Sequence, residues 1–309
     1  MPKLLFTTST FNLKNFVELE SFKSAGFEFI LNPYGKRLTE AQVAELLDEH
    51  VVGMVAGVEP LTESVINNAK ALKVISRCGI GLDNVDLNAA ERNNISIFNT
   101  PDAPSKAVAE LSVAHILSLS RRIAECDRAL RRGHWQPLMG SLISKQTVGI
   151  VGFGRIGRLV SKILLAMGAR VLVYDAIEIK SDIDIETVSL DELLIKSDIV
   201  SLHLPYSQDT HHLINAKKLS LMKSHALLIN VARGGLIDET ALISALNNKI
   251  ISGAALDCFE DEPYTGPLLE CEGVQMTAHM GSYAKEARAM MEAEACASLV
   301  KGLKQHGFF

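Results

Sequence analysis

A glycine-rich segment in the middle of the chain constrains the fold more than any other feature. The apolar run Val148–Val151 has the pattern of a strand buried on both faces, and the hexapeptide Gly-Phe-Gly-Arg-Ile-Gly at 152–157 follows it directly. An apolar-periodic helix comes next and ends at Gly168, after which a second β-branched run, 170–174, stops at Asp175. A strand, a glycine turn, a helix, a strand and an acid in this order predict a dinucleotide-binding unit.

Each glycine of the hexapeptide is expected to have its own role. Gly152 permits a tight turn, Gly154 leaves room for a pyrophosphate at the helix N-terminus, and Gly157 lets helix and strand pack closely. Asp175 is placed to accept hydrogen bonds from ribose hydroxyls, and its charge would repel a 2′-phosphate. Because no arginine follows Asp175, we predict NAD as the cofactor rather than NADP.

The composition excludes several classes of function. The 309 residues suffice for two domains, and a net charge of −5 without any basic run argues against nucleic acid as a partner. The five cysteines are scattered and lack CxxC spacing, so we expect neither a disulfide framework nor a metal site, as in a reducing cytosol. The N-terminus resembles a first strand rather than a signal peptide, and no apolar run is long enough to cross a membrane. We therefore expect a cytoplasmic protein without a membrane partner.

Residues 3–98 alternate between strand and helix patterns. Strands are expected at Lys3–Thr7, Phe27–Leu31, Val51–Val55, Val74–Arg77 and Ile95–Phe98, and helices at Leu13–Ala25, Thr39–Leu47, Thr62–Asn68 and Leu87–Asn93. Thr39 and Gln42 have the spacing of a capping box. This alternation predicts a parallel sheet covered by helices. Because the region lacks a glycine fingerprint, we expect it to form a separate α/β unit.

A turn-rich segment, 99–104, marks a boundary, and one long helix is expected from about 106 to 132, ended by Gly133. Its broad apolar face suits an interdomain brace, a dimer surface or a core helix equally well. After Asp175 the alternation resumes. Helices are expected at Leu190–Ile195, Ala216–Met222, Glu239–Asn247 and Ala284–Gln305, and strands at Ile199–Leu202, Ala226–Asn230, Gly253–Leu256 and Val274–Thr277.

Four side chains that suit chemistry follow predicted strands, at the edge where a doubly wound sheet binds ligands. They are His203, Arg233, Asp257 and His279. Arg233 is followed by two glycines, which suggests close approach of the backbone to another group. Taken singly, each has an ordinary structural explanation: a surface arginine, a solvated acidic loop or a hydrogen-bonded histidine.

Together, the motifs resemble those of the D-isomer-specific 2-hydroxyacid dehydrogenases. The matching segments are RCGIGLDNVDLNAA (77–90), NTPDAPSKAVAEL (99–111), GFGRIG (152–157), VARGGLIDETAL (231–242), GAALDCFEDEP (253–263) and TAHMG (277–281). The resemblance implies an α/β fold with two Rossmann-like doubly wound parallel-sheet domains and an active site in the cleft between them. A flavodoxin-like substrate domain would comprise residues 1–98 and 284–309, and an NAD-binding domain residues 99–283. The helix region 106–132 would form a homodimer.

The resemblance also implies three catalytic residues. Arg233 would bind the substrate carboxylate and keto oxygen, and His279 would exchange a proton with that oxygen while hydride moves between carbon and the nicotinamide. Glu262 would orient the ring of His279 and favour its protonated form. This division of labour is chemically sensible, because the reaction needs a group that titrates near neutrality beside a fixed positive charge.

Further contacts are implied by the same resemblance. Arg155 and Ile156 would lie along the pyrophosphate, Asp175 on the adenosine ribose, and His203 and Pro205 beside the adenine. Val231 and Asp257 would approach the nicotinamide. The substrate carboxylate would face the loop formed by Arg77, Cys78, Gly79, Ile80 and Gly81.

The branch of the family with the strongest resemblance is that of D-3-phosphoglycerate dehydrogenase, which begins serine biosynthesis. The segments 77–90 and 279–288 carry this hypothesis, with Arg77 as a candidate partner of a substrate phosphate and a surface arginine as the equally good alternative. We expect no serine-sensing domain after the closing helix. A glyoxylate, hydroxypyruvate or other 2-ketoacid reductase is the alternative enzyme, and an NAD-sensing, corepressor-like interaction protein is the alternative outside catalysis.

Overall fold

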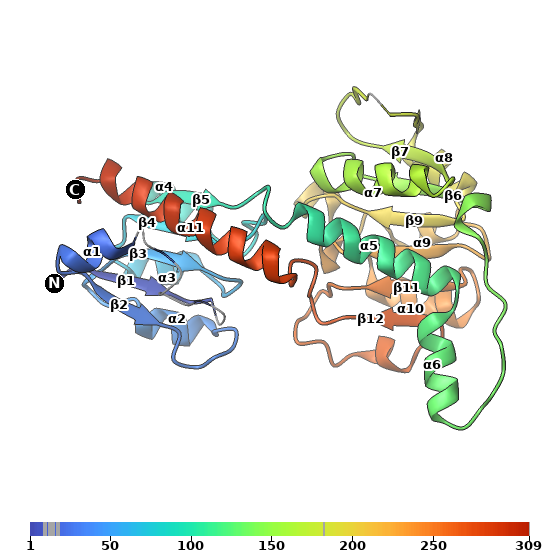
Figure 1. Ribbon diagram of the computed structural model, residues 1–309, viewed down its shortest axis with the longest axis horizontal. Helices are drawn as coiled ribbons and strands as arrows, with labels where there is room; N and C mark the ends of the chain where they lie inside the picture. The colour runs from blue at the N-terminus through green and yellow to red at the C-terminus, as the bar shows by residue number, and fades with distance from the viewer. Residues whose placement is uncertain (9–10, 12–15, 17–18, 182, 309) are drawn as a thin grey trace. The chain divides into compact units, whose positions relative to one another are not determined.

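The computed structural model describes residues 1–8, 11, 16, 19–181 and 183–308. They form two compact units, which are described separately (Figure 1). Unit 1 comprises Met1–Pro104 and Ser282–Phe309, and unit 2 comprises Ser105–Gly281. These divisions lie at 104/105 and 281/282, whereas the sequence predicted domain boundaries at 98/99 and 283/284. No described helix is both long and apolar enough to span a membrane.

Unit 1 is built on a five-stranded parallel sheet of order β2-β1-β3-β4-β5, the flavodoxin-like order. Its strands are β1 (Lys3–Phe6), β2 (Glu28–Leu31), β3 (Val51–Ala56), β4 (Val74–Arg77) and β5 (Ser96–Asn99). Its helices are α1 (Glu20–Ser24), α2 (Glu40–Leu46), α3 (Glu63–Asn68), α4 (Leu87–Arg92) and α11 (Lys285–Gln305). The predicted capping box of Thr39 and Gln42 is present at the start of α2.

Both faces of this sheet are buried by helices. Helices α2, α3 and α4 pack with Leu5, Met54 and Ile75 on one face. Helices α1 and α11 pack with Leu4, Phe6 and Val55 on the other, so the C-terminal helix belongs to the core of unit 1. Residues 13–15, 17 and 18 of the predicted helix 13–25 lie outside the described residues, and α1 is the helix described at its C-terminal end.

Unit 2 contains a seven-stranded parallel sheet of order β12-β11-β10-β9-β6-β7-β8. Its strands are β6 (Thr147–Val151), β7 (Arg170–Tyr174), β8 (Glu186–Thr187), β9 (Ile199–Leu202), β10 (Leu227–Asn230), β11 (Gly253–Leu256) and β12 (Val274–Met276). Its helices are α5 (Ser105–Ser120), α6 (Ile123–Arg131), α7 (Arg155–Ala166), α8 (Leu190–Lys196), α9 (Ala216–Leu219) and α10 (Glu239–Asn247). Strands β7 and β8 follow on one side of β6, and β9 to β12 follow on its other side. This reversal of strand order makes the carboxyl ends of β6 and β9 the switch point of a Rossmann fold.

The helices of unit 2 cover its sheet on both sides. Helices α5 and α7 pack on one face around Val148, Ile150 and Ile229, and α8, α9 and α10 pack on the other around Val200, Leu228 and Leu256. Short 3-10 turns occupy Ile143–Lys145, Gln208–Thr210, Gly234–Leu236 and Pro267–Glu270. These turns and the two-residue strand β8 were not predicted, because they are too short to show a hydrophobic period.

The prediction of one helix from 106 to 132 was wrong. The chain forms α5 and α6 instead, separated at Arg122, which has a left-handed backbone conformation (φ 54°). The last carbonyl of α5, on Ser120, accepts a hydrogen bond from the Ser141 N–H at 2.8 Å, which replaces the next helical turn. The Arg122 guanidinium then pairs with Glu125 at 2.6 and 2.8 Å and stabilises the first turn of α6.

The two halves of that segment differ in burial. Helix α5 buries Val108, Val113 and Ile116 in unit 2, so it is a core helix. Helix α6 buries none of its residues and projects from the rest of unit 2 (Figure 1). The core-helix interpretation therefore applies to α5 and not to α6.

Candidate active site

The glycine turn lies at the switch point of unit 2. Gly152 has a φ of +97°, and a Cβ there would lie 2.7 Å from the carbonyl oxygen of His203, which follows β9. A Cβ on Gly157 would lie 2.1 Å from the carbonyl oxygen of Gly152, so helix α7 approaches the turn too closely for any side chain. At Gly154 a Cβ would meet nothing within 4 Å. The turn therefore presents open space before the N-terminus of α7, where Arg155 and Ile156 begin the helix, and this fits a pyrophosphate.

Two further residues at this edge suit a nucleotide. Asp175 follows β7, and its Oδ2 accepts the Phe153 N–H at 2.7 Å, which holds the carboxylate beside the glycine turn. Burial lowers the pKa of His203 to about 3, so its ring is neutral. Its Nε2 lies 2.9 Å from Ser201 Oγ, and its buried Nδ1 has no hydrogen-bond partner among the described residues. That nitrogen suits a ligand contact, and the nearby Pro205 is exposed.

Arg233 follows β10 and Val231, which is buried. Its Nη1 donates to the carbonyl oxygen of Ala232 at 2.7 Å. The two glycines after it do approach other groups closely, but these are parts of unit 2 itself. A Cβ on Gly234 would lie 1.9 Å from the Phe259 backbone, and one on Gly235 would lie 2.5 Å from the Tyr206 ring. The glycines therefore fix the Arg233 backbone against neighbouring loops.

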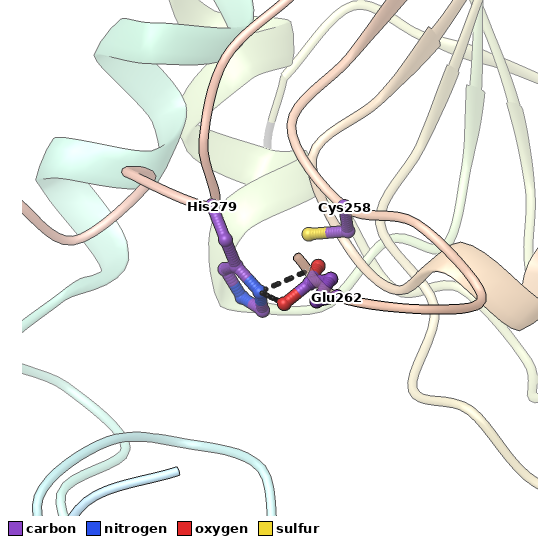
Figure 2. Close-up of side chains that lie close together, drawn as sticks. All are labelled: Cys258, Glu262 and His279. Carbon is purple, nitrogen blue, oxygen red and sulfur yellow. Dashed lines mark hydrogen bonds and ion pairs between the residues drawn. The ribbon is translucent and has the colours of Figure 1, made fainter. Parts of the chain in front are cut away.

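His279 and Glu262 are brought together from separate loops (Figure 2). The Nδ1 atom of His279 lies 2.8 Å from Oε2 and 3.0 Å from Oε1 of Glu262. Glu262 Oε1 also accepts the Phe259 N–H at 3.1 Å, which orients the carboxylate. The His279 side chain remains 38% exposed, so it is available to a ligand. Because the carboxylate accepts at Nδ1, the other ring nitrogen is the one positioned to exchange a proton.

The loop that carries His279 is anchored by Asp257, which is fully buried after β11. The Asp257 carboxylate accepts hydrogen bonds from the backbone N–H groups of Met280 and Gly281, each at 2.8 Å, and from Thr277 Oγ1 at 2.5 Å. These bonds fix the two residues after His279, whose own φ of 51° places it in the left-handed region. Asp257 thus has a positioning role that its predicted contact with a nicotinamide did not include.

A series of hydrogen bonds links Asp257 to helix α5. Thr277 has one hydroxyl proton and gives it to Asp257, so its oxygen must accept from His115 Nε2 at 3.2 Å. His115 Nδ1 then carries a lone pair and accepts from Gln275 Nε2 at 2.7 Å. Burial lowers the pKa of His115, although the charge of Asp257 acts to raise it. The neutral ring is the form that this series of hydrogen bonds requires. We missed His115 in the sequence because it falls on the apolar face of a predicted helix.

In unit 1, the predicted substrate loop follows β4. Thr100 N–H donates to the Gly79 carbonyl at 3.0 Å, and Asn99 Nδ2 donates to the Ile80 carbonyl at 2.8 Å. Because a trans peptide places N–H opposite C=O, the N–H groups of Ile80 and Gly81 point away from these partners. This orientation suits the capture of a carboxylate.

Arg77 supports the loop from within. Only 8% of it is exposed, its Nη1 donates to the Cys78 carbonyl at 2.6 Å, and a Cβ on Gly79 would lie 1.2 Å from that nitrogen. Burial raises the pKa of the nearby Glu59 carboxyl, while Thr7, the Gly57 N–H and the charge of Arg77 lower it. Burial also raises the pKa of the Cys78 thiol to about 11, so that thiol is protonated near neutrality.

The chain is similar to known dehydrogenases and reductases. Residues 113–281 match the model of the D-isomer specific 2-hydroxyacid dehydrogenase, NAD binding domain. The chain is 36% identical to a hydroxypyruvate reductase of Thermotoga maritima over 87% of this chain and 90% of the relative. It is 37% identical to a D-3-phosphoglycerate dehydrogenase of Synechocystis over 81% of this chain, but it spans only 46% of that relative. The crystal structure of an Aquifex aeolicus D-lactate dehydrogenase with NAD and lactic acid superposes with a TM-score of 0.86, at 28% identity, over 98% of this chain and 96% of that one.

Proposed function

Because the chain belongs to the D-isomer-specific 2-hydroxyacid dehydrogenase family, we propose that it reduces small 2-keto acids to D-2-hydroxy acids, with Arg233, Glu262 and His279 as its catalytic residues. The chain is an NAD-dependent oxidoreductase that acts on CH–OH groups. The observation that carries the residue assignment is the 2.8 Å contact between His279 Nδ1 and Glu262. A histidine held by a carboxylate at one nitrogen and accessible at the other is suited to acid–base catalysis.

When bound, NADH supplies the hydride that reaches the substrate carbon. His279 gives a proton to the keto oxygen in the same step, and Glu262 stabilises the charged ring before transfer and fixes its orientation. Arg233 pairs with the substrate carboxylate and stabilises negative charge on the keto oxygen. In the reverse direction His279 accepts the hydroxyl proton.

We assign the cofactor to the switch point of unit 2. The open space at Gly154 and the amides at the start of α7 fit the pyrophosphate, and Asp175 fits the ribose hydroxyls. The unpartnered Nδ1 of His203 fits a polar edge of the adenine. The carboxylate of Asp175 favours NAD over NADP, since a 2′-phosphate beside it would be repelled.

Two classes of substrate are considered, phosphorylated and unphosphorylated acids. The phosphoglycerate hypothesis requires Arg77 to reach a phosphate, yet Arg77 is buried and donates to its own loop. This favours a structural arginine and hence an unphosphorylated 2-keto acid such as glyoxylate or hydroxypyruvate. The second candidate is 3-phosphoglycerate, which is favoured by the segments 77–90 and 279–288.

A substrate panel distinguishes these classes. NADH oxidation is measured with glyoxylate, hydroxypyruvate and pyruvate, and NAD reduction at alkaline pH with 3-phosphoglycerate, D-glycerate, D-lactate and 2-hydroxyglutarate. We expect the unphosphorylated acids to have the higher kcat/KM, and Arg77→Lys to lower it for all substrates alike. A preference for 3-phosphoglycerate that Arg77→Lys selectively weakens would instead assign the phosphate to Arg77 and the reaction to serine biosynthesis.

We also propose a homodimer formed through α6 and the segment that follows it. Ile123, Leu130, Trp135 and Met139 are large apolar residues that are exposed there. Light scattering should give a mass of twice 33.6 kDa. The double variant Leu130→Ser/Trp135→Ser should be monomeric, and a monomeric wild-type chain would exclude this assembly.

A further inference from the structure

A thiol lies beside the histidine–glutamate pair (Figure 2). Cys258, Glu262 and His279 each offer one potential ligand atom, and these three atoms all lie within 4.8 Å of one another. Cys258 and Glu262 belong to the segment after β11, and His279 to the loop after β12. Cys258 and Glu262 lie in one short acidic segment, whereas His279 comes from a later loop, and no CxxC-type spacing connects them.

These donors match the preferences of zinc. Zn²⁺ takes thiolate sulfur at about 2.3 Å, imidazole nitrogen at about 2.0–2.1 Å and carboxylate oxygen at about 2.0–2.2 Å, in a tetrahedron. Such bond lengths place the ligand atoms roughly 3–4 Å apart, so the three side chains need only small rotations to close on one ion. Three protein ligands leave a fourth position for water. The thiol disfavours Mg²⁺ and Ca²⁺, which prefer ligand sets made of oxygen.

The surroundings hold the ligands in place before any metal arrives. The Cys258 side chain is buried, and its Sγ lies 3.4 Å from the Ala232 carbonyl oxygen. Glu262 is oriented by the Phe259 N–H, and the His279 loop is fixed by Asp257. A site whose ligands are already positioned loses less entropy when the ion binds.

We propose that Cys258, Glu262 and His279 form a zinc site whose occupation switches off the enzyme. On binding, the S–H bond of Cys258 breaks, a Zn–S bond forms and the proton passes to solvent, with no change of oxidation state. The metal takes the Glu262 carboxylate and one imidazole nitrogen for itself. Because the ion occupies both members of the histidine–glutamate pair, it competes directly with acid–base catalysis. The inhibition rests on the proposed function, whereas the binding does not.

The test uses the full chain, freed of metal by a chelator and kept reduced with a phosphine. Co²⁺ and Cd²⁺ are titrated first, because a thiolate ligand gives a sulfur-to-metal charge-transfer band and tetrahedral Co²⁺ gives intense visible bands. The expected result is one metal ion per chain with both signatures. Cys258→Ala should abolish the charge-transfer band, while Cys126→Ala, which removes a thiol on α6, should retain it.

Activity provides the second readout. Zn²⁺ should abolish turnover of the wild-type enzyme, and a chelator should restore it. Cys258→Ala should keep its turnover without zinc and need at least about 100-fold more Zn²⁺ for the same inhibition, since even outer-shell partners of a ligand contribute about 10- to 100-fold to affinity. Equal sensitivity of Cys258→Ala and the wild type would overturn the proposal, as would the absence of a thiolate band. If no 2-hydroxy acid is turned over, the proposed function fails, but the band still decides the metal site.

Discussion

His279 Nδ1 lies 2.8 Å from Glu262 Oε2, although the two residues belong to loops separated by strand β12. This contact fixes the orientation of the imidazole ring. With the carboxylate at Nδ1, the other ring nitrogen is left to serve the substrate. The geometry is that of a catalytic base positioned by a second group, as in other acid–base pairs.

Substitution of His279 or Glu262 should affect turnover more than the binding of NADH. His279→Ala should lower kcat by about 10²- to 10⁴-fold, the range that one general acid–base group contributes. Glu262→Gln should lower kcat less, because the ring stays in place but loses its charge partner. Steady-state kinetics and NADH fluorescence separate the two effects. His225→Ala, which alters an exposed histidine before β10, is the matched control. Unchanged kcat in His279→Ala would refute the assignment.

The hydrogen-bond chain beneath His279 should contribute to stability. Thr277→Val removes the donor to Asp257 and the acceptor of His115, and leaves both buried groups short of a partner. We expect a loss of about 1–3 kcal/mol in the free energy of unfolding, measured with urea. The exposed Thr187 provides a control, because Thr187→Val should change stability by less than about 0.5 kcal/mol. Equal effects of the two substitutions would show that the hydrogen bonds of Thr277 contribute little to stability.

Stability should fall as the pH drops below about 6.5, because of buried neutral histidines. The folded-state pKa of His203 is lowered to about 3, whereas an unfolded histidine titrates near 6.5. Between these values the unfolded chain binds the extra proton, so each such histidine contributes a slope of up to about 1.4 kcal/mol per pH unit. The pKa of His115 is lowered too, in the same direction.

Urea unfolding between pH 5 and 7 checks this prediction. The His203→Asn variant should show a shallower slope than the wild type. The contributions of other groups are the same in both proteins and cancel when the two slopes are compared. One such group is Glu59, whose raised pKa makes stability increase as the pH falls. Identical slopes would mean that His203 accepts a proton in the folded state.

Asp175 should set the choice of cofactor. In Asp175→Ser the hydroxyl can still accept the Phe153 N–H, but the charge that repels a 2′-phosphate is gone. We expect the ratio of kcat/KM for NADPH to that for NADH to rise about tenfold or more, equivalent to about 1.4 kcal/mol. Asp184→Ser, in the exposed loop beyond, should leave the ratio unchanged.

The sequence predicted most of the fold because its signals are local. The glycine turn, the alternation of apolar runs and the capping residues of α2 each depend on a few adjacent side chains. The break between α5 and α6 at Arg122 has no such local signal, because apolar residues continue on both sides of it. What ends α5 is the backbone of Ser141, twenty-one residues beyond Ser120, and this contact exists only after folding.

The site was predictable in part for the same reason. Arg233, Glu262 and His279 each lie in recognisable motifs, but motifs carry no distances. The two glycines after Arg233 signalled close approach, yet the groups approached are Phe259 and Tyr206 of unit 2 rather than a ligand. The roles of Asp257 and His115 as an anchor, and the position of the Cys258 thiol beside His279, depend on how separate strands align in the sheet.

The most direct test of the central claim is the stereochemistry of the product. Wild-type enzyme and NADH are allowed to react to completion with hydroxypyruvate or pyruvate, whose reduced products are chiral, unlike the glycolate formed from glyoxylate. The hydroxy acid is then resolved by chiral chromatography. We predict the D-enantiomer alone, formed in equal amount to the NADH consumed. We also predict that His279→Ala forms this product at least about 100-fold more slowly although it still binds NADH. Formation of the L-enantiomer, or turnover by His279→Ala at the wild-type rate, would contradict the account.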